Sequence, residues 1–150
     1  NRNLKIAGTG PLEDELIDYT KSNNVTKVEF LGYKSGKELT DLVENAYFII
    51  VPSEWYENNP MTIIEGYAAG VPVIGTNIGG IPEIIEEGVT GYLFTPANSV
   101  DLTRVVKAAD SLPAEQYSNY QQNALSFARK HFDREKYYPQ LIGFYNQLVK

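Results

Sequence analysis

Glu57 and Glu65 flank a stretch whose residue types are typical of a helix start, in "WYENNPMTIIEGYAAGVPVIG". Asn59 is the predicted N-cap, and Pro60 is the predicted first helical residue. Carboxylates accept paired hydrogen bonds from vicinal sugar hydroxyls, and the amides of a helix start favour a phosphate. An elongated ligand with hydroxyls at both ends and an anion between them fits this stretch, and a nucleotide sugar has that order of groups.

The helix determines which of these groups share a face. Met61, Thr62 and Ile63 would carry the helix-start amides, and Glu65 lies on the same face as Met61 and Thr62. Glu57 precedes the cap, in the loop. A plainer interpretation is that both glutamates are solvated charges, because an acid near a helix start is favourable by itself. Spacing alone favours this plainer interpretation.

Five short apolar runs, each bounded by glycine or proline, predict the strands that position this helix. They lie at 4–8, 28–32, 48–52, 71–75 and 92–94. Amphipathic stretches predict helices at 11–24, 36–46, 60–69, 82–87, 99–112 and in the remainder of the chain. The alternation predicts an α/β protein with a Rossmann-like parallel sheet and helices on both faces. Ligands of such sheets bind outside the carboxyl ends of the strands.

Single residues predict where several helices begin and end. Pro11 is the predicted first residue of one helix, Ser99 and Asp133 are predicted N-caps, and Gly70 is predicted to follow the third helix. Pro139 lies inside the last predicted helix and predicts a kink there.

The first two strand ends carry small residues that make them candidates for contact with a nucleotide. Gly8 and Gly10 lie in "GTGP" after the first strand, and Gly32 and Tyr33 follow the second. Position 13 is Glu, where the dinucleotide fingerprint requires a third glycine. The first loop therefore fits a tight turn as well as a ligand contact, and a solvated loop is the favoured interpretation of the second.

The loop after the fourth strand, "TNIGGIPE", contains a glycine pair and then Pro82, which marks another helix start. Gly79 and Gly80 either approach the same cleft or only turn the chain. Glu83 fits an acid of a first helical turn. The single histidine, His131, fits a structural role beside an apolar stripe.

The composition bounds the class of protein. The chain has 150 residues, of which 43% are hydrophobic and 21% charged, so one globular domain is expected. The 13 basic and 19 acidic residues give a net charge of −6, which argues against a nucleic-acid partner. Cysteine is absent and histidine occurs once, so a thiolate or multi-histidine metal site is not expected.

Two features of the chain bear on its location and extent. No apolar run approaches membrane-spanning length and no signal peptide opens the sequence, so a cytoplasmic location is expected. Asn1-Arg2-Asn3 leads directly into a predicted buried strand. We therefore expect residues 1–150 to be one domain of a longer protein.

Taken in order, the motifs resemble the C-terminal, donor-binding half of a retaining GT-B glycosyltransferase of the family called GT4 or glycosyl transferases group 1. The resemblance rests on "IAGTGPLEDEL", "VEFLGY", "PSEWYENNPMTIIEGYAAGVPVIGTNIGGIPEIIEEGVTGYLF" and the closing helices, essentially the whole chain. The two glutamates with seven residues between them are its specific part. It implies transfer of a sugar from a nucleoside diphosphate to an acceptor hydroxyl with retention of anomeric configuration, as in polysaccharide or glycolipid biosynthesis.

The resemblance also implies a role for each matching residue. Glu57 would bind donor-sugar hydroxyls near the reacting carbon, which makes it the catalytic candidate, and Glu65 would hold the ribose hydroxyls. Gly32 and Tyr33 would lie near the base. The segment between the two glutamates would bind the donor sugar and diphosphate through Asn59, Pro60, Met61 and Thr62.

Partners and cofactors follow from the same resemblance. Such enzymes are generally metal-independent, and the sequence has no Asp-x-Asp element, so no metal or other cofactor is expected. The implied partners are a nucleotide-sugar donor and an acceptor sugar, oligosaccharide or lipid-linked acceptor held by a missing N-terminal domain. Peripheral membrane association of the full-length protein is left open. An arginine and a lysine that contact the diphosphate should precede Asn1, so we expect the chain alone to have little or no transferase activity.

Two positions depart from the family pattern, and two other classes of protein remain as alternatives. Asn58 stands where a glycine is usual, and Gly66 where an alanine is usual; both changes are tolerable. Half of a nucleotide-sugar 2-epimerase shares the architecture. A flavodoxin-like regulatory domain would need an aspartate with neighbouring acids at a strand end, where Ser53 and Glu54 follow the third strand instead. The sequence names neither the sugar, the base (UDP, GDP or ADP) nor the acceptor.

Overall fold

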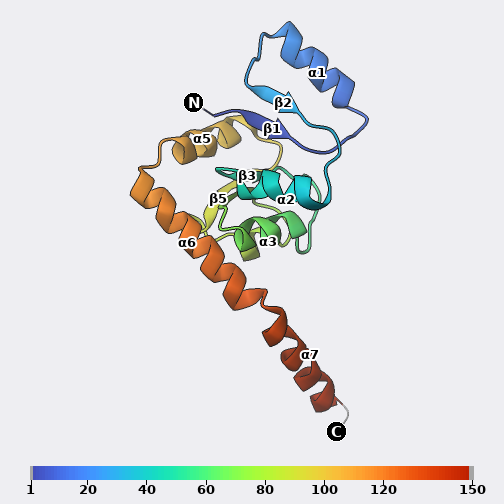
Figure 1. Cartoon of the computed structure of the whole chain (residues 1–150), viewed down its shortest axis with the longest axis vertical. Helices are drawn as coiled ribbons and strands as arrows, with labels where there is room; N and C mark the ends of the chain where they lie inside the picture. The colour runs from blue at the N-terminus through green and yellow to red at the C-terminus, as the bar shows by residue number, and fades with distance from the viewer. Residues whose placement is uncertain (1, 149–150) are drawn as a thin grey trace. The chain divides into compact units, whose positions relative to one another are not determined.

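The computed structural model describes residues 2–148, apart from the side chain of Arg134, and strands alternate with helices along most of this length (Figure 1). The chain forms two compact units, Asn1–Leu42 and Val43–Lys150. The alternation predicted from the apolar runs is therefore confirmed, and the class is α/β.

The first unit is built on a parallel strand pair. β1 (Leu4–Ile6) and β2 (Val28–Phe30) pair in parallel, and α1 (Glu13–Ser22) is the crossover between them. The prediction that Pro11 begins α1 is wrong, because the helix begins two residues later. Three acids occupy its first turn, where the helix dipole favours negative charge: Glu13, Asp14 and Glu15.

The second unit contains a three-stranded parallel sheet. β3 (Ile49–Val51), β4 (Val73–Thr76) and β5 (Gly91–Phe94) pair in the order β3-β4-β5. α2 (Gly36–Glu44) contains the boundary between the two units, and α3 (Met61–Ala68) and α4 (Ile81–Ile84) connect the strands of this sheet. The strands thus pair in two groups, where the sequence predicted one sheet. β1, β2 and β3 are three residues long, so each offers few backbone groups for a longer ladder.

Three further helices complete the second unit. They are α5 (Ser99–Asp110), α6 (Ala114–His131) and α7 (Arg134–Leu148), and Pro139 lies inside α7 as predicted. Among residues 2–148, no helix has both the length and the apolar character that crossing a bilayer requires.

Helices cover both faces of the central strand, as predicted for a Rossmann-like sheet. All of β4 is buried, and its successive side chains point to opposite faces. Val73 joins a core cluster with residues of α3, α4 and α6, whereas Ile74 joins a second cluster with Val105 and Ala109 of α5. Burial on two sides explains the apolar residues Val73 and Ile74 at successive positions of this strand.

Close packing surrounds two glycines of this unit, one against backbone and one against a side chain. A Cβ at Gly91 would overlap the backbone of Val73, its neighbour on β4. A Cβ at Gly66 would lie 2.6 Å from Ile49 Cδ1, which is the end of a flexible side chain. An alanine at position 66 would therefore require a small shift of the Ile49 side chain.

The helix ends of the second unit differ in part from prediction. Pro60, with φ −62° and ψ 118°, is the N-cap of α3, so Asn59 does not cap it and the helix begins at Met61. The extended ψ of Pro60 keeps it outside the helix. Gly70 follows the C-cap of α3 with φ +71°, which confirms its predicted role because glycine adopts the left-handed region without strain.

Two other caps were predicted, one wrongly and one correctly. Asn98, not Ser99, caps α5, because its side chain accepts a hydrogen bond from Asp101 N at 3.0 Å. Asp133 precedes α7 and accepts a hydrogen bond from Glu135 N at 2.9 Å through its side chain, as predicted.

Replacing Asp101 with asparagine is expected to lower the Tm at pH 7. The backbone amide of Thr95, with the Arg104 guanidinium and the Thr95 hydroxyl, lowers the pKa of Asp101 from 3.8 to about 2. Because the folded-state pKa lies below the unfolded one, this stabilisation is complete above about pH 4 and is lost as the pH falls toward 2. Thermal melts of both proteins should therefore converge at acidic pH; a constant difference in Tm down to pH 2 would contradict this account.

Candidate active site

The loop between β3 and α3, residues 52–60, is called the Glu57 loop here. It holds the Glu57 side chain in place. Glu57 is half-buried, and its Oε1 accepts a hydrogen bond from Ser53 Oγ at 3.3 Å. Among residues 2–148, its second carboxylate oxygen has no hydrogen-bond partner. Thr76, at the end of β4 and 1% exposed, donates from Oγ1 to the Ser53 carbonyl at 2.8 Å. The carboxylate is thus oriented from two strand ends, with one oxygen left for a ligand.

The glycine pair after β4 packs directly on the backbone of the Glu57 loop. Gly80 N donates to the Glu57 carbonyl at 2.7 Å. A Cβ at Gly79 would lie 2.6 Å from that same oxygen, and a Cβ at Gly80 would overlap the Asn58 carbonyl. Only glycine leaves room for this contact. The sequence left open whether the pair reaches the cleft, and the structure places it against the catalytic candidate.

Four residues that position Glu57 were therefore not assigned this role from the sequence. Ser53 and Thr76 carry no distinctive motif, because a single hydroxyl after a strand is common. The Gly79-Gly80 pair did carry a signal, since two consecutive glycines before a helix start indicate a close backbone approach.

The start of α3 presents amide groups beside this loop. Ile63 N is bonded to the Pro60 carbonyl at 3.1 Å. The amides of Met61 and Thr62 have no hydrogen-bond partner among residues 2–148. Met61 and Thr62 are exposed, and Pro60 is buried. Two free amides at a helix start can receive an anion, and the proline shapes the loop that leads to them.

Glu65 lies one helical turn beyond Met61 and is exposed. Its side chain has no hydrogen bond or ion pair among residues 2–148. The carboxylate is therefore available to a ligand. Asn59 is exposed as well.

The four nucleotide-proximal candidates belong to the first unit, which is described by itself. Gly8 N donates to the Gly32 carbonyl at 2.8 Å, and both glycines have positive φ, +127° and +64°. Gly10 is exposed, and its carbonyl accepts from Glu13 N at 3.1 Å. Tyr33 is 74% exposed. The structure therefore brings Gly8 and Gly32 together at the carboxyl ends of β1 and β2.

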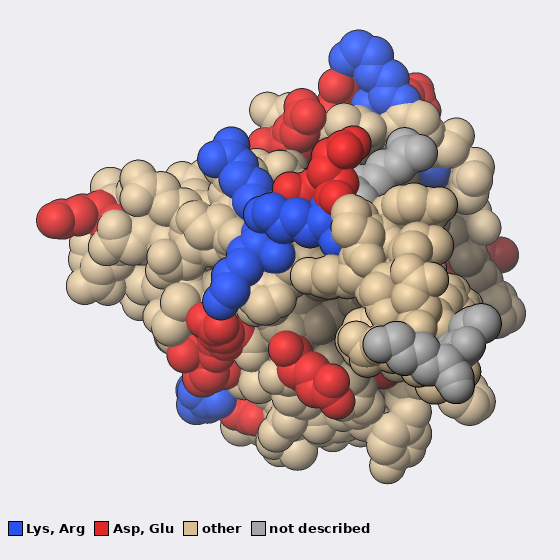
Figure 2. All heavy atoms as spheres, turned by 90° about the horizontal axis from the view of Figure 1, so that it is seen from below, with Lys and Arg blue, Asp and Glu red and all other residues tan. Residues whose placement is uncertain are grey.

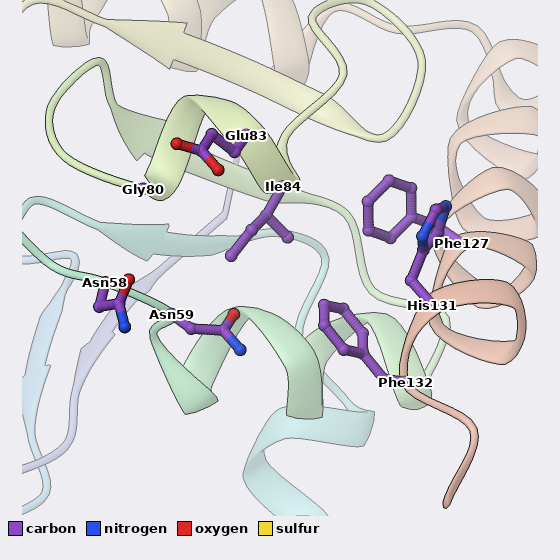
Figure 3. A pocket seen from close by; sticks show the side chains of 8 residues that line it. All are labelled: Asn58, Asn59, Gly80, Glu83, Ile84, Phe127, His131 and Phe132. Carbon is purple, nitrogen blue, oxygen red and sulfur yellow. The ribbon is translucent and has the colours of Figure 1, made fainter. Parts of the chain in front are cut away.

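A cavity of about 440 Å³ lies beside the Glu57 loop. Asn58, Asn59 and Gly80 line it from the loop and the glycine pair (Figure 3). The remaining lining comes from α4 and from the end of α6: Glu83, Ile84, Phe127, His131 and Phe132. His131 was expected to be structural, and its ring does lie 4.4 Å from that of Phe127, but it also borders this space.

Charged side chains of both signs occur on the surface of the protein. On the face shown in Figure 2, a central band of basic side chains is flanked by acidic ones, so neither sign dominates. Among residues 2–148, no three histidine, aspartate or glutamate side chains gather so as to hold a metal ion.

Comparison with known sequences identifies the family. Residues 1–127 match the family described as glycosyl transferases group 1. Glycogen synthase of Mycobacterium tuberculosis is 34% identical over 112 residues, which cover 74% of this chain and 27% of that protein. N-acetyl-alpha-D-glucosaminyl L-malate synthase of Bacillus anthracis is 30% identical over 150 residues, 98% of this chain and 38% of that protein.

Solved structures show the same fold. HepE of Anabaena, crystallised in complex with UDP, has a TM-score of 0.86 at 22% identity, covering 97% of this chain and 41% of that chain. The C-terminal domain of the group 1 glycosyl transferase LpcC of Francisella tularensis has a TM-score of 0.72 at 22% identity, covering 84% of this chain and 66% of that chain. The chain thus spans about two fifths of the HepE chain and less of the two sequence relatives.

The structural neighbours are GT-B glycosyltransferases, so the fold that the resemblance implied is confirmed. The match over residues 1–127 covers most of the sequence and includes both glutamates. The chain belongs to the glycosyl transferases group 1 family.

Proposed function

We propose that this chain is the donor-binding half of a retaining glycosyltransferase, which moves a sugar from a nucleoside diphosphate to an acceptor hydroxyl. The observation that carries the proposal is the Glu57 carboxylate. It is held at one oxygen by Ser53 and open at the other, and free helix-start amides follow it in the chain. HepE, which shares the fold, was crystallised with UDP and with UDP-glucose.

The proposed roles follow the order of groups in a nucleotide sugar. Glu57 accepts hydrogen bonds from donor-sugar hydroxyls near the reacting carbon, and Asn59 and Pro60 shape the loop around that sugar. Met61 and Thr62 offer their amides to the diphosphate, whose negative charge grows as the bond to the sugar breaks. Glu65 accepts hydrogen bonds from the ribose, and Gly8, Gly10, Gly32 and Tyr33 lie toward the nucleotide.

We further propose that the reaction needs no metal and proceeds with retention. Both proposals rest on the family resemblance. In the absence of a metal, the charge of the leaving diphosphate must be met by amides and cationic side chains. Addition of EDTA to the complete protein should leave the rate unchanged, and the anomeric coupling constant in the NMR spectrum of the product should equal that of the donor.

A calorimetric screen of UDP-, GDP- and ADP-sugars against the complete protein tests the proposed function. We expect one class of base to bind, and incubation with a matching acceptor should then release free nucleoside diphosphate and glycosylated product. An epimerised donor without transfer would replace this function with that of a 2-epimerase. Absence of binding by all three classes would contradict it.

Residues 1–150 alone are expected to transfer sugar at less than about 1% of the rate of a complete protein that also holds the acceptor. The reason is that groups which stabilise charge and position the acceptor would be absent. The chain spans 41% of the HepE chain. A discontinuous assay with radiolabelled donor compares the two proteins at equal molarity. Equal rates would show that the chain is sufficient for catalysis.

Replacing Glu65 with alanine is expected to weaken nucleoside diphosphate binding by roughly 1.5–3 kcal/mol, about 10- to 150-fold in Kd, because it removes a charged acceptor of ribose hydrogen bonds. Isothermal titration of the complete protein measures this. Glu115→Ala is the matched control, because Glu115 is also an exposed acid on a helix. The ribose assignment fails if Glu65→Ala binds the nucleotide as tightly as the wild type.

A further inference from the structure

The cavity beside the Glu57 loop is lined by both apolar and hydrogen-bonding side chains. In Figure 3, Phe127 and Phe132 point from the end of α6 toward Ile84 of α4 and Asn59 of the Glu57 loop. The volume of about 440 Å³ lies in the range of small-molecule sites. All its lining residues belong to the second unit, so one unit forms the whole cavity.

The aromatic side of the cavity is fixed by ring contacts. The Phe127 centroid lies 5.6 Å from that of buried Tyr67, 6.0 Å from that of Phe132 and 4.4 Å from that of His131. Tyr67 is itself anchored, because its hydroxyl donates to Thr90 Oγ1 at 2.7 Å. A ligand would therefore meet aromatic surface that is already ordered, which lowers the entropic cost of binding.

The polar side of the cavity has unused hydrogen-bonding capacity. Asn59 and Glu83 are exposed, and among residues 2–148 neither side chain has a hydrogen bond or an ion pair. An asparagine amide both donates and accepts, whereas a carboxylate only accepts. Together they suit a ligand that carries several hydroxyl groups.

The charge of the lining disfavours an anion. Glu83 would repel a phosphate, and among residues 2–148, with the side chain of Arg134 left aside, no lysine or arginine lines the cavity. A neutral pyranose ring has the required surfaces, because its C–H groups pack on aromatic rings while its hydroxyls donate to carboxylates and amides. Because the cavity borders the Glu57 loop, a ring bound in it would lie beside the proposed donor sugar.

We propose that this cavity is a subsite for a neutral sugar ring of a substrate, formed by Asn59, Glu83, Ile84, Phe127, His131 and Phe132. The proposal rests on the proposed function, because it supplies the reason for a sugar to be present. The ring belongs either to the acceptor glycan or to the donor sugar itself, and kinetic measurements separate these two sources.

Saturation-transfer NMR of the complete protein with methyl glycosides of glucose, mannose, galactose and N-acetylglucosamine tests the subsite without requiring catalysis. Signals on the ring C–H protons of at least one glycoside are expected in the wild type. Glu83→Ala should reduce them several-fold, and Glu86→Ala, an exposed acid three residues further along and outside this cavity, should not. No signal in the wild type, or equal signals in wild type and Glu83→Ala, overturns the proposal.

Steady-state kinetics with the same variants identify the source of the ring. Loss of one charged hydrogen-bond acceptor in Glu83→Ala should raise one KM by about 10-fold; a change in the acceptor KM assigns the ring to the acceptor, and a change in the donor KM to the donor. His131→Ala should raise the same KM, and His131→Phe should restore it by keeping a ring against Phe127. If no sugar is transferred by the wild type, the proposed function fails while the NMR result still decides the subsite.

Discussion

Replacing Glu57 with alanine in the complete protein is expected to lower kcat/KM for sugar transfer by about 100-fold or more. A hydrogen bond to a charged group contributes about 1.5–3 kcal/mol, and a contact near the reacting carbon strengthens as the transition state forms. A loss of about 2.7 kcal/mol in the transition state corresponds to 100-fold in rate. We expect most of the loss in kcat, because the sugar would still be held through its nucleotide.

The supporting residue provides a graded comparison for this variant. Ser53→Ala removes the hydrogen bond to Glu57 Oε1, 3.3 Å long, but leaves the carboxylate. Its effect on kcat/KM should be smaller than that of Glu57→Ala, about 3- to 10-fold, because the carboxylate remains and only one hydrogen bond that orients it is lost. The role assigned to Glu57 is wrong if Glu57→Ala retains the wild-type kcat/KM in initial-rate measurements.

Replacing Gly80 with alanine is expected to lower kcat/KM by about 10- to 100-fold, because misplacement of a catalytic group by about 1 Å costs up to 100-fold. The added Cβ would overlap the Asn58 carbonyl. That atom is backbone, so it cannot move aside without displacing Glu57, whose carbonyl accepts from Gly80 N at 2.7 Å. The Glu57 carboxylate would shift with its own main chain.

Gly143→Ala is the matched control for this substitution. It adds the same methyl group at a glycine where nothing lies within 4 Å of the new Cβ, and it should leave kcat/KM unchanged. Circular dichroism melts distinguish misplacement of the loop from loss of the fold, because a folded Gly80→Ala protein should keep most of the wild-type helical signal. Wild-type kcat/KM in a folded Gly80→Ala protein would show that the contact does not position Glu57.

Much of the fold could be predicted from local patterns in the sequence. Each of the five predicted strands corresponds to an observed strand, with ends that differ by a few residues. The left-handed Gly70 after α3 was also predictable, since its conformation depends on the nearest residues. The helix starts were less predictable: Pro60 and Asn98 cap helices where Asn59 and Ser99 were expected, because several neighbouring residues can serve as a cap.

What the sequence by itself determined is the α/β class, the family, and the position of Glu57 and Glu65 around a helix start at the end of a strand. The class follows from hydrophobic periodicity, the family from the resemblance of motifs along the whole chain, and the position of the two glutamates from one short segment. Only the tertiary structure decided that Gly79 and Gly80 rest on the backbone of Glu57, that Thr76 anchors Ser53, and that His131 borders a cavity with Asn59. The physical reason is that these contacts join segments distant in the chain. They depend on how strands pair and helices pack, which no local pattern specifies.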